Sequence, residues 1–552
     1  MRRNFFFILF GFLGLALPQA LFSQSKSPRL VVGIVVDQMR YDYLYRYATQ
    51  YSAEGFQRLM KEGFLCRNAH YNFAPTETGP GHASVYTGTT PAVNGIVGND
   101  WFEKGKENYC AGDTTEKAVG SETGYGEISP RNLFSTTLGD ELKLATAQRA
   151  KVIGISLKDR GAVLPAGHTA NGAYWFDQNS GHFITSTYYM DKLPDWVAQY
   201  NARRRPDYFL TQTWQTLRPI KEYTASQADD NPYEQALPGQ PKAVFPYDFK
   251  ALTEALAKSQ MKRPPYGLLT GTPYGNTLVN EMALEALKAE ALGQDDITDL
   301  LAISYSSTDI GGHAFGPQSV EVQDIYLRLD QEIALLLKTL DAQVGKGNYT
   351  LFLTADHAVT QVPRYAQDLR LPGGYADSKK MQDELSAHLE KTYGAGKWVL
   401  TGDDKGVYLN RALLKEKKLS QEMVEREVVD FVRQYTWVYD AYTATDLQRQ
   451  QYQQGIMALV QAGYYHGRSP DVLIVAKTGY LSKSWERGGT SHGSPHRYDT
   501  HVPILFFGQG IPAGHTVREV YVSDIAPTMT MLLNLQMPSG ATGKPIGEIF
   551  EK

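Results

Sequence analysis

Residues 29–36 read Arg-Leu-Val-Val-Gly-Ile-Val-Val and are followed directly by Asp37 and Gln38. A short apolar run that is rich in β-branched residues predicts a strand buried on both faces of its sheet. Similar runs recur along the chain at residues 151–156, 300–306, 349–354, 472–476 and 503–507. Strands of this kind that alternate with helices predict an α/β fold, with a mostly parallel sheet sandwiched by helices.

Helical patterns and two long irregular segments fill the chain between these strands. The expected helices are residues 55–62, 133–146, 278–292 and 320–343, and the last has a clear period near 3.6. Residues 159–298 are rich in Tyr, Trp, Pro and Asn, and residues 361–470 are only partly helical. We therefore expect one α/β domain over residues 25–552 that carries two cap-like insertions.

The composition is that of an ordinary globular protein. Of the 552 residues, 42% are hydrophobic and 21% are charged. Such a chain can bury a sizeable core, so disorder is not its expected state. The formal net charge is −4, whereas nucleic-acid binders usually carry a basic excess. We therefore expect no nucleic-acid partner.

The amino-terminal residues show the three-part pattern of a secretory signal peptide. Arg2 and Arg3 precede an apolar run over residues 5–17, and small and polar residues follow. The run is short for a membrane span, which needs about 20 residues. An uncleaved membrane anchor is the alternative. We expect residues 1–24 to be removed and the protein to reach the periplasm or the medium, without lasting membrane insertion.

The chain contains only two cysteines, Cys66 and Cys110, and both lie in the part that would be exported. Export permits a disulfide bond between them. Two buried free thiols are the alternative, and the sequence does not decide between the two states.

Aspartate and histidine residues stand where the predicted strands end. They are Asp37 after residues 29–36, Asp309 and His313 after 300–306, Asp356 and His357 after 349–354, and His492 before 503–507. Active sites of parallel sheets lie at such strand ends. A single aspartate there is commonly only a helix cap. Three Asp and three His together are ligands that Zn²⁺ accepts, and six suit two metal ions about 3.5–4 Å apart.

A nucleophile beside these ligands is expected at Thr78, within the segment Pro-Thr-Glu-Thr-Gly-Pro-Gly-His-Ala-Ser of residues 75–84. The glycines that follow Thr78 let the backbone approach a ligand, and a helix that begins here would direct its N–H groups toward an anion. Metal coordination can convert a threonine hydroxyl into an alkoxide near neutral pH. The alternative is a helix-capping threonine. His82 is expected to be structural.

Taken together, six motifs resemble the PafA-type bacterial alkaline phosphatases, which are also similar to nucleotide pyrophosphatase/phosphodiesterases. The motifs occur in the family's order at residues 31–47, 75–101, 156–168, 307–317, 354–358 and 489–506. The resemblance therefore covers nearly the whole mature chain. It implies an alkaline phosphatase that hydrolyses small phosphate monoesters through a phosphothreonine on Thr78.

The resemblance also assigns roles to single residues. It implies one Zn²⁺ held by Asp309, His313 and His492, and a second Zn²⁺ held by Asp37, Asp356, His357 and Thr78. It implies that the phosphate oxygens are bound by Asn99, Lys158 and Arg160. His496 and His501 lie close to His492, but the family pattern places the ligand before a glycine, which selects His492.

Three other functions are alternatives to an alkaline phosphatase. A phosphodiesterase or nucleotide pyrophosphatase would keep the same two metal ions, but would not need Lys158 and Arg160, because a diester carries one charge fewer. A sulfatase would carry Cys-x-Pro-x-Arg or its serine variant, and neither occurs. A non-catalytic binding protein would usually have lost ligands. We therefore expect the phosphatase, acting as a monomer.

Overall fold

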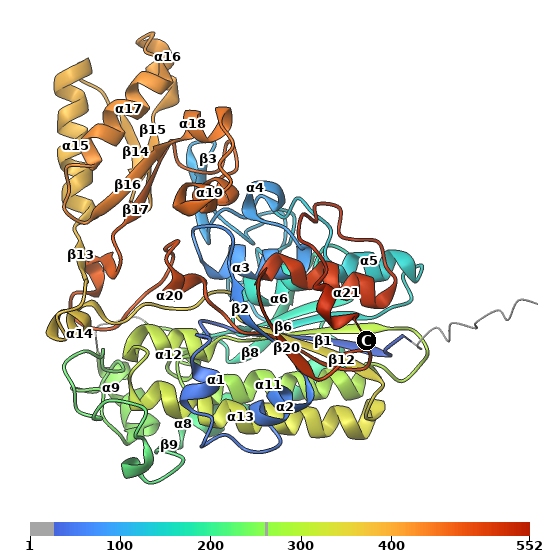
Figure 1. Ribbon diagram of the computed structural model, residues 1–552. Helices are drawn as coiled ribbons and strands as arrows, with labels where there is room; N and C mark the ends of the chain where they lie inside the picture. The colour runs from blue at the N-terminus through green and yellow to red at the C-terminus, as the bar shows by residue number, and fades with distance from the viewer. Residues whose placement is uncertain (1–26, 260–262, 552) are drawn as a thin grey trace, which may run out of the picture.

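The computed structural model describes residues 27–259 and 263–551 (Figure 1). The predicted signal peptide, residues 1–24, lies outside this part of the chain. Among the helices of the described residues, none is long and apolar enough to cross a membrane.

A ten-stranded sheet forms the centre of the molecule, in the order β20-β2-β19-β12-β1-β11-β6-β7-β8-β5. Its strands are β1 (Leu30–Val36), β2 (Phe64–His70), β5 (Ala118–Val119), β6 (Val152–Ser156), β7 (Gly172–Asp177), β8 (His182–Ser186), β11 (Asp299–Tyr305), β12 (Tyr349–Thr354), β19 (Ile504–Gly508) and β20 (Gly514–Tyr521). The five strands from β12 to β7 pair in parallel. Strand β1 is fully buried at their centre, as its apolar sequence predicts. The predicted fold class is confirmed.

Two of the predicted strands differ from the expected arrangement. Residues 503–507 become β19, which pairs antiparallel with both of its neighbours. Residues 472–476 become β17 (Val472–Ala476), which belongs to a separate antiparallel sheet. An apolar run shows that a strand is buried, but it does not show which sheet buries it.

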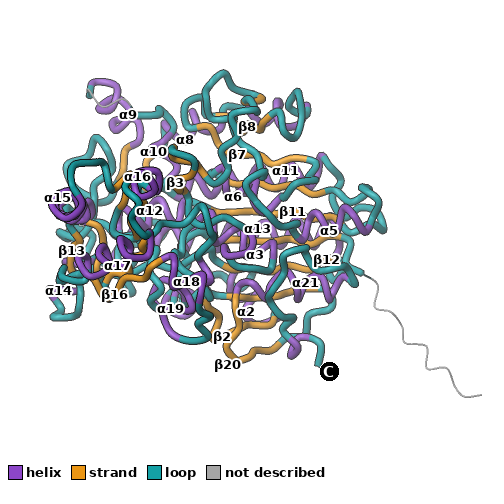
Figure 2. The backbone as a smooth tube through the Cα atoms, turned by 90° about the horizontal axis from the view of Figure 1, so that it is seen from above, coloured by secondary structure: helices purple, strands orange, loops and turns teal. Residues whose placement is uncertain are grey.

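Helices cover both faces of the main sheet (Figure 1). One layer contains α3 (Thr78–Thr87), α5 (Leu138–Ala145), α6 (Asp159–Ala166) and α21 (Ile525–Leu533), and the other contains α2 (Phe56–Glu62), α11 (Pro273–Ala289) and α13 (Val320–Leu340). Viewed from above, the strands of the main sheet lie side by side (Figure 2). Side-chain caps begin two of these covering helices: for α5, Thr137 accepts a hydrogen bond from the Asp140 N–H, and for α13, Ser319 accepts one from the Val322 N–H.

A second, smaller unit stands beside this body, and we call residues 374–482 the small lobe (Figure 1). It contains a four-stranded sheet of β14 (Val399–Gly402), β15 (Gly406–Leu409), β17 and β16 (Val438–Thr443). Helices α15 (Ser378–Tyr393) and α17 (Gln421–Val432) share a hydrophobic core with this sheet. At the base of the lobe, β13 (Gly374–Ala376) pairs with β18 (Tyr480–Ser482).

The segment over residues 159–298, expected as a cap, has two parts. It supplies β7, β8 and α11 to the main body, and it also forms a peripheral region from α7 (Asp195–Ala202) to α10 (Gly267–Thr270). Cys66 and Cys110 are both buried free thiols. The structure thus favours free thiols over a disulfide, the two states that the sequence left open.

Candidate metal centre and nucleophile

The parallel strands bring the predicted ligands to one edge of the sheet. In the register of β1, Val35 lies opposite both Ser304 of β11 and Thr354 of β12. All three strands therefore end at the same level. The predicted ligands come directly after these strand ends in the chain. They are Asp37 after β1, Asp309 and His313 on α12 (Ser307–Phe315) after β11, and Asp356 and His357 after β12. His492 enters from the loop that precedes β19.

The first group of ligand atoms consists of Asp37, Asp356 and His357, and these atoms all lie within 4.8 Å of one another. The Nε2 atom of His357 is 3.5 Å from Asp37 Oδ1 and 3.6 Å from Asp356 Oδ2. Each of these three atoms is buried and has no hydrogen-bond partner. Leaving one polar group unpaired in this way costs about 1–3 kcal/mol. Three unpaired atoms that converge on one point therefore fit a bound metal ion.

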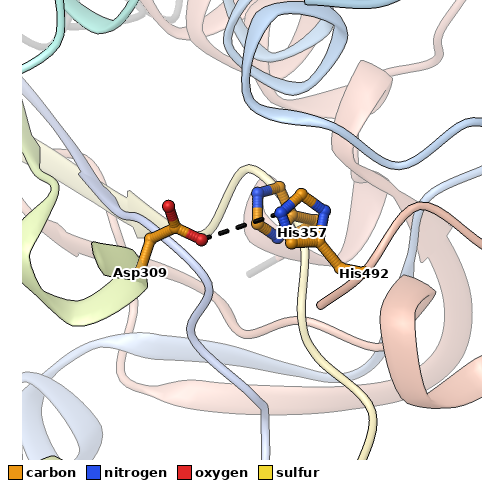
Figure 3. Close-up of side chains that lie close together, drawn as sticks. All are labelled: Asp309, His357 and His492. Carbon is orange, nitrogen blue, oxygen red and sulfur yellow. Dashed lines mark ion pairs between the residues drawn. The ribbon is translucent and has the colours of Figure 1, made fainter. Parts of the chain in front are cut away.

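The second group differs in membership from the predicted one. Asp309 lies within 4.8 Å of both His357 and His492 (Figure 3). The rings of these two histidines stack, with their centroids 3.4 Å apart. The third predicted ligand, His313, places its Nε2 atom 3.1 Å from Asp309 Oδ1. The structure thus brings all six predicted ligands together, and places His357 between the two groups.

Backbone carbonyl groups fix the orientation of the three histidine rings. The Nδ1 atoms lie close to carbonyl oxygens: His313 is 2.8 Å from Thr490 O, His357 is 3.0 Å from Ala358 O, and His492 is 2.7 Å from Thr76 O. A carbonyl oxygen can only accept, so Nδ1 must carry the proton. The lone pair on Nε2 is then directed toward the carboxylates, as in metal-binding histidines.

The two histidines near His492 face elsewhere. The Nε2 atom of His496 contacts the carbonyl of Ala476, and that of His501 contacts the carbonyl of Arg67. Neither has its Nε2 directed at the carboxylates, so the geometry supports the choice of His492.

Burial and mutual repulsion act on the ligand carboxylates. Burial, followed by the charges of Asp309 and Asp356, raises the pKa of Asp37 to about 8. Burial raises the pKa of Asp356 to about 6. It would also raise the pKa of Asp309, but His313 and Lys158 hold that pKa well below its usual value. Closely spaced buried carboxylates favour binding of cations.

Lys158 supplies one such cation in this structure. Its Nζ atom is 2.6 Å from Asp37 Oδ2 and 2.6 Å from Asp309 Oδ2. The same atom is 3.4 Å from the hydroxyl of Thr78. Lys158 therefore lies between the two ligand groups and beside the expected nucleophile.

Thr78 is the first residue of α3 and is 1% exposed. A Cβ atom on Gly81, in the same first turn, would lie 2.2 Å from the carbonyl oxygen of Asp356. Only glycine lets the helix pack this closely on the ligand segment. His82 contacts the Thr78 carbonyl at 2.9 Å and the Ser304 hydroxyl at 2.9 Å, which is the structural position expected for it.

The predicted phosphate-binding residues lie around the same helix end. The side-chain carbonyl of Asn99 accepts a hydrogen bond from the Gly79 N–H at 2.8 Å, so its NH₂ group is the part left for a substrate. Arg160 donates to the Tyr109 hydroxyl at 3.1 Å, and this hydroxyl donates to Asp159. Sequence reasoning missed Tyr109, which no motif separates from the other tyrosines.

Metal binding should depend on pH, because protons compete for Asp37 and Asp356. We expect zinc affinity to rise by about tenfold per pH unit for each proton displaced, between about pH 6 and 8, and then to level off. The metal-free fold should lose stability as the pH rises from about 4 to about 8, because Asp37 and Asp356 hold their protons more tightly than in the unfolded chain, where their pKa is near 3.8. Zinc titration with a competing chelator, together with thermal unfolding of the metal-free protein, measures both. An affinity that is constant from pH 6 to 8 would contradict these carboxyl pKa values.

This fold, with two groups of candidate metal ligands at one edge of its sheet, is that of a known family of proteins. The family model of type I phosphodiesterases and nucleotide pyrophosphatases matches residues 31–499, and the chain belongs to this family. Two relatives that are named alkaline phosphatases match nearly the whole chain. PafA of Elizabethkingia meningoseptica is 42% identical over 95% of this chain and 94% of its own length. PhoV of Synechococcus elongatus is 43% identical, covering 96% and 95%.

A solved structure shows the same relationship. The crystal structure of wild-type alkaline phosphatase PafA matches this structure with a TM-score of 0.90 and 42% sequence identity. The match covers 95% of this chain and 99% of that chain. The resemblance to PafA-type alkaline phosphatases that the sequence motifs indicate is therefore confirmed.

Proposed function

We propose that this chain is an exported alkaline phosphatase that hydrolyses phosphate monoesters on two zinc ions, with Thr78 as its nucleophile. The class of reaction follows from relatives that are 42% and 43% identical over almost the whole chain. One observation supports the mechanism most strongly: two groups of buried ligand atoms converge beside a threonine at a helix amino terminus.

The unpartnered atoms of Asp37, Asp356 and His357 fit one zinc ion, with the Thr78 hydroxyl as a further ligand. Asp309, His313 and His492 would hold the second. When bound, the two ions would stabilise charge on the attacking and leaving oxygens and lower the pKa of coordinated hydroxyl groups.

The reaction would have two steps, the formation of a phosphothreonine and its hydrolysis. The Thr78 hydroxyl gives up its proton to solvent and its oxygen attacks phosphorus. The bond to the alcohol oxygen breaks, the alcohol leaves after taking up a proton from solvent, and a phosphothreonine forms. A water molecule hydrolyses this ester and restores the hydroxyl. The cations of Lys158 and Arg160 would bind the other phosphate oxygens. Asn99 would donate through its NH₂ group.

Lys158 and Arg160 distinguish this proposal from a phosphodiesterase. A monoester dianion has two charged terminal oxygens for these cations to bind, whereas a diester has one negative charge and a second bulky group. Lys158 lies 3.4 Å from the Thr78 hydroxyl, where a bound phosphoryl group would meet it. The substrate would be a small phosphate monoester, bound by a monomer.

Replacing both cations tests this proposal. We expect Lys158→Ala/Arg160→Ala to lower kcat/KM for p-nitrophenyl phosphate by about 150- to 25,000-fold, since two hydrogen bonds to charged groups are lost and each contributes about 1.5–3 kcal/mol. The rate on bis-p-nitrophenyl phosphate should fall less, because a diester carries one negative charge fewer for these cations to bind. Lys192→Ala, which removes an 86% exposed charge, is the matched control. Wild-type preference for the diester that the double substitution leaves unchanged would favour the phosphodiesterase.

A further inference from the structure

A lysine of the small lobe reaches the residue that precedes the nucleophile. Lys405 lies in the turn between β14 and β15, and its ammonium group forms an ion pair with Glu77. The two residues are 328 positions apart in the sequence. The turn itself is fixed, because Asp403 accepts a hydrogen bond from the Lys405 N–H at 2.8 Å. No role in the reaction derived above involves this pair.

The lysine side chain also lies against the loop that carries the ligand His492. A Cβ atom on Gly493 would be 3.1 Å from both Cε and Nζ of Lys405. The φ angle of Gly493 is +118°, a conformation that residues with side chains rarely adopt. Lys405 thus packs on the glycine next to a predicted metal ligand and pairs with the residue next to the nucleophile.

Glu77 uses its two carboxylate oxygens for different partners. Oε1 pairs with Lys405, and Oε2 accepts a hydrogen bond from the Asn99 N–H at 2.8 Å. The Asn99 side-chain carbonyl in turn accepts from Gly79. These contacts fix Asn99 at both its backbone and its amide, and so direct its NH₂ group toward the substrate position.

This arrangement places a carboxylate beside a site for an anion. The ion pair with Lys405 through Oε1 and the hydrogen bond from the Asn99 N–H to Oε2 both favour the charged carboxylate of Glu77. An unpaired carboxylate here would repel bound phosphate, and would repel a dianion twice as strongly as a monoanion. Lys405 removes this repulsion while leaving the hydrogen bond to Asn99 in place.

We propose that Lys405 is a positioning residue of the small lobe, which neutralises Glu77 and so lets this carboxylate hold Asn99 without repelling a dianionic substrate. The inference rests on the proposed monoester hydrolysis. It gives the small lobe a part in selecting monoesters over diesters.

Charge removal at this pair tests the inference. We expect Lys405→Met to lower kcat/KM for p-nitrophenyl phosphate by about 10- to 100-fold, the usual effect of leaving one partly buried charge unpaired. Inhibition by inorganic phosphate should weaken in parallel. The rate on bis-p-nitrophenyl phosphate should fall less. Lys379→Met, at an exposed lysine of α15 in the same lobe, is the matched control.

A second substitution separates electrostatics from misfolding. Glu77→Gln removes the negative charge while its amide oxygen can still accept from Asn99, so Glu77→Gln/Lys405→Met should recover most of the lost monoester activity. Lys405→Arg should retain it. An unchanged monoester-to-diester ratio in Lys405→Met, or no recovery in the double variant, would overturn the inference. Absence of monoester turnover in the wild type would instead overturn the proposed function.

Discussion

Thr78→Ala is expected to lower the turnover of p-nitrophenyl phosphate by at least roughly 1,000-fold, as loss of a nucleophile does in other enzymes. The substitution removes the oxygen atom that attacks phosphorus. It should leave the fold intact, because Thr78 is the first residue of α3 and not its N-cap, which is Glu77. Alanine is also a good helix former. Metal content and melting temperature should therefore stay close to those of the wild type.

Thr78→Ser is the matched control, because it keeps a hydroxyl at the same position while removing a methyl group. We expect it to retain far more activity than Thr78→Ala. Steady-state rates on metal-loaded protein, with zinc content measured on the same samples, provide the comparison. Near-wild-type rates in Thr78→Ala with full metal content would mean that another group attacks phosphorus.

Removing the metal ions is expected to abolish turnover and to lower the melting temperature. Asp37 and Asp356 are completely buried, and Asp309 is nearly so. Without cations these carboxylates repel one another. Each ion present at 1,000 times its dissociation constant contributes about 4 kcal/mol to the free energy of unfolding. Dialysis against a chelator, followed by zinc addition, should therefore show a reversible loss of both rate and thermal stability.

Two single substitutions test whether the proposed ligands themselves hold the metal ions. Asp37→Asn weakens a ligand and should reduce both the zinc stoichiometry and the zinc-dependent rise in melting temperature. Asp383→Asn, on the exposed surface of α15, should change neither. A chelated protein that keeps its rate, or an Asp37→Asn variant with full zinc content, would show that these ligands do not hold a catalytic metal.

The sequence predicted four of the five central parallel strands, and the strand ends at which the candidate ligands lie, for a physical reason. A strand buried on both faces needs a continuous apolar run, and polar residues become possible only where it ends. Asp37 and Asp356 stand at such ends. Because neighbouring parallel strands end at one edge, residues that are remote in sequence could be expected to meet there.

Other features had no local signal in the sequence. The run that forms β17 is as apolar as β6, yet it lies in the small lobe and pairs antiparallel. The contact between Glu77 and Lys405 depends on how the small lobe is placed, and single lysines in turns are usually only solvated. The stacking of His357 on His492 depends on the loop that precedes β19.

The position of the metal ions is the central claim and can be measured directly. Crystals of the zinc-loaded protein would be measured at the zinc absorption edge, and an anomalous difference map would be calculated. We expect two peaks, one held by Asp37, Asp356, His357 and Thr78, and the other by Asp309, His313 and His492. A single peak held by Asp309, His357 and His492, or no peak at this edge of the sheet, would contradict the two-metal site.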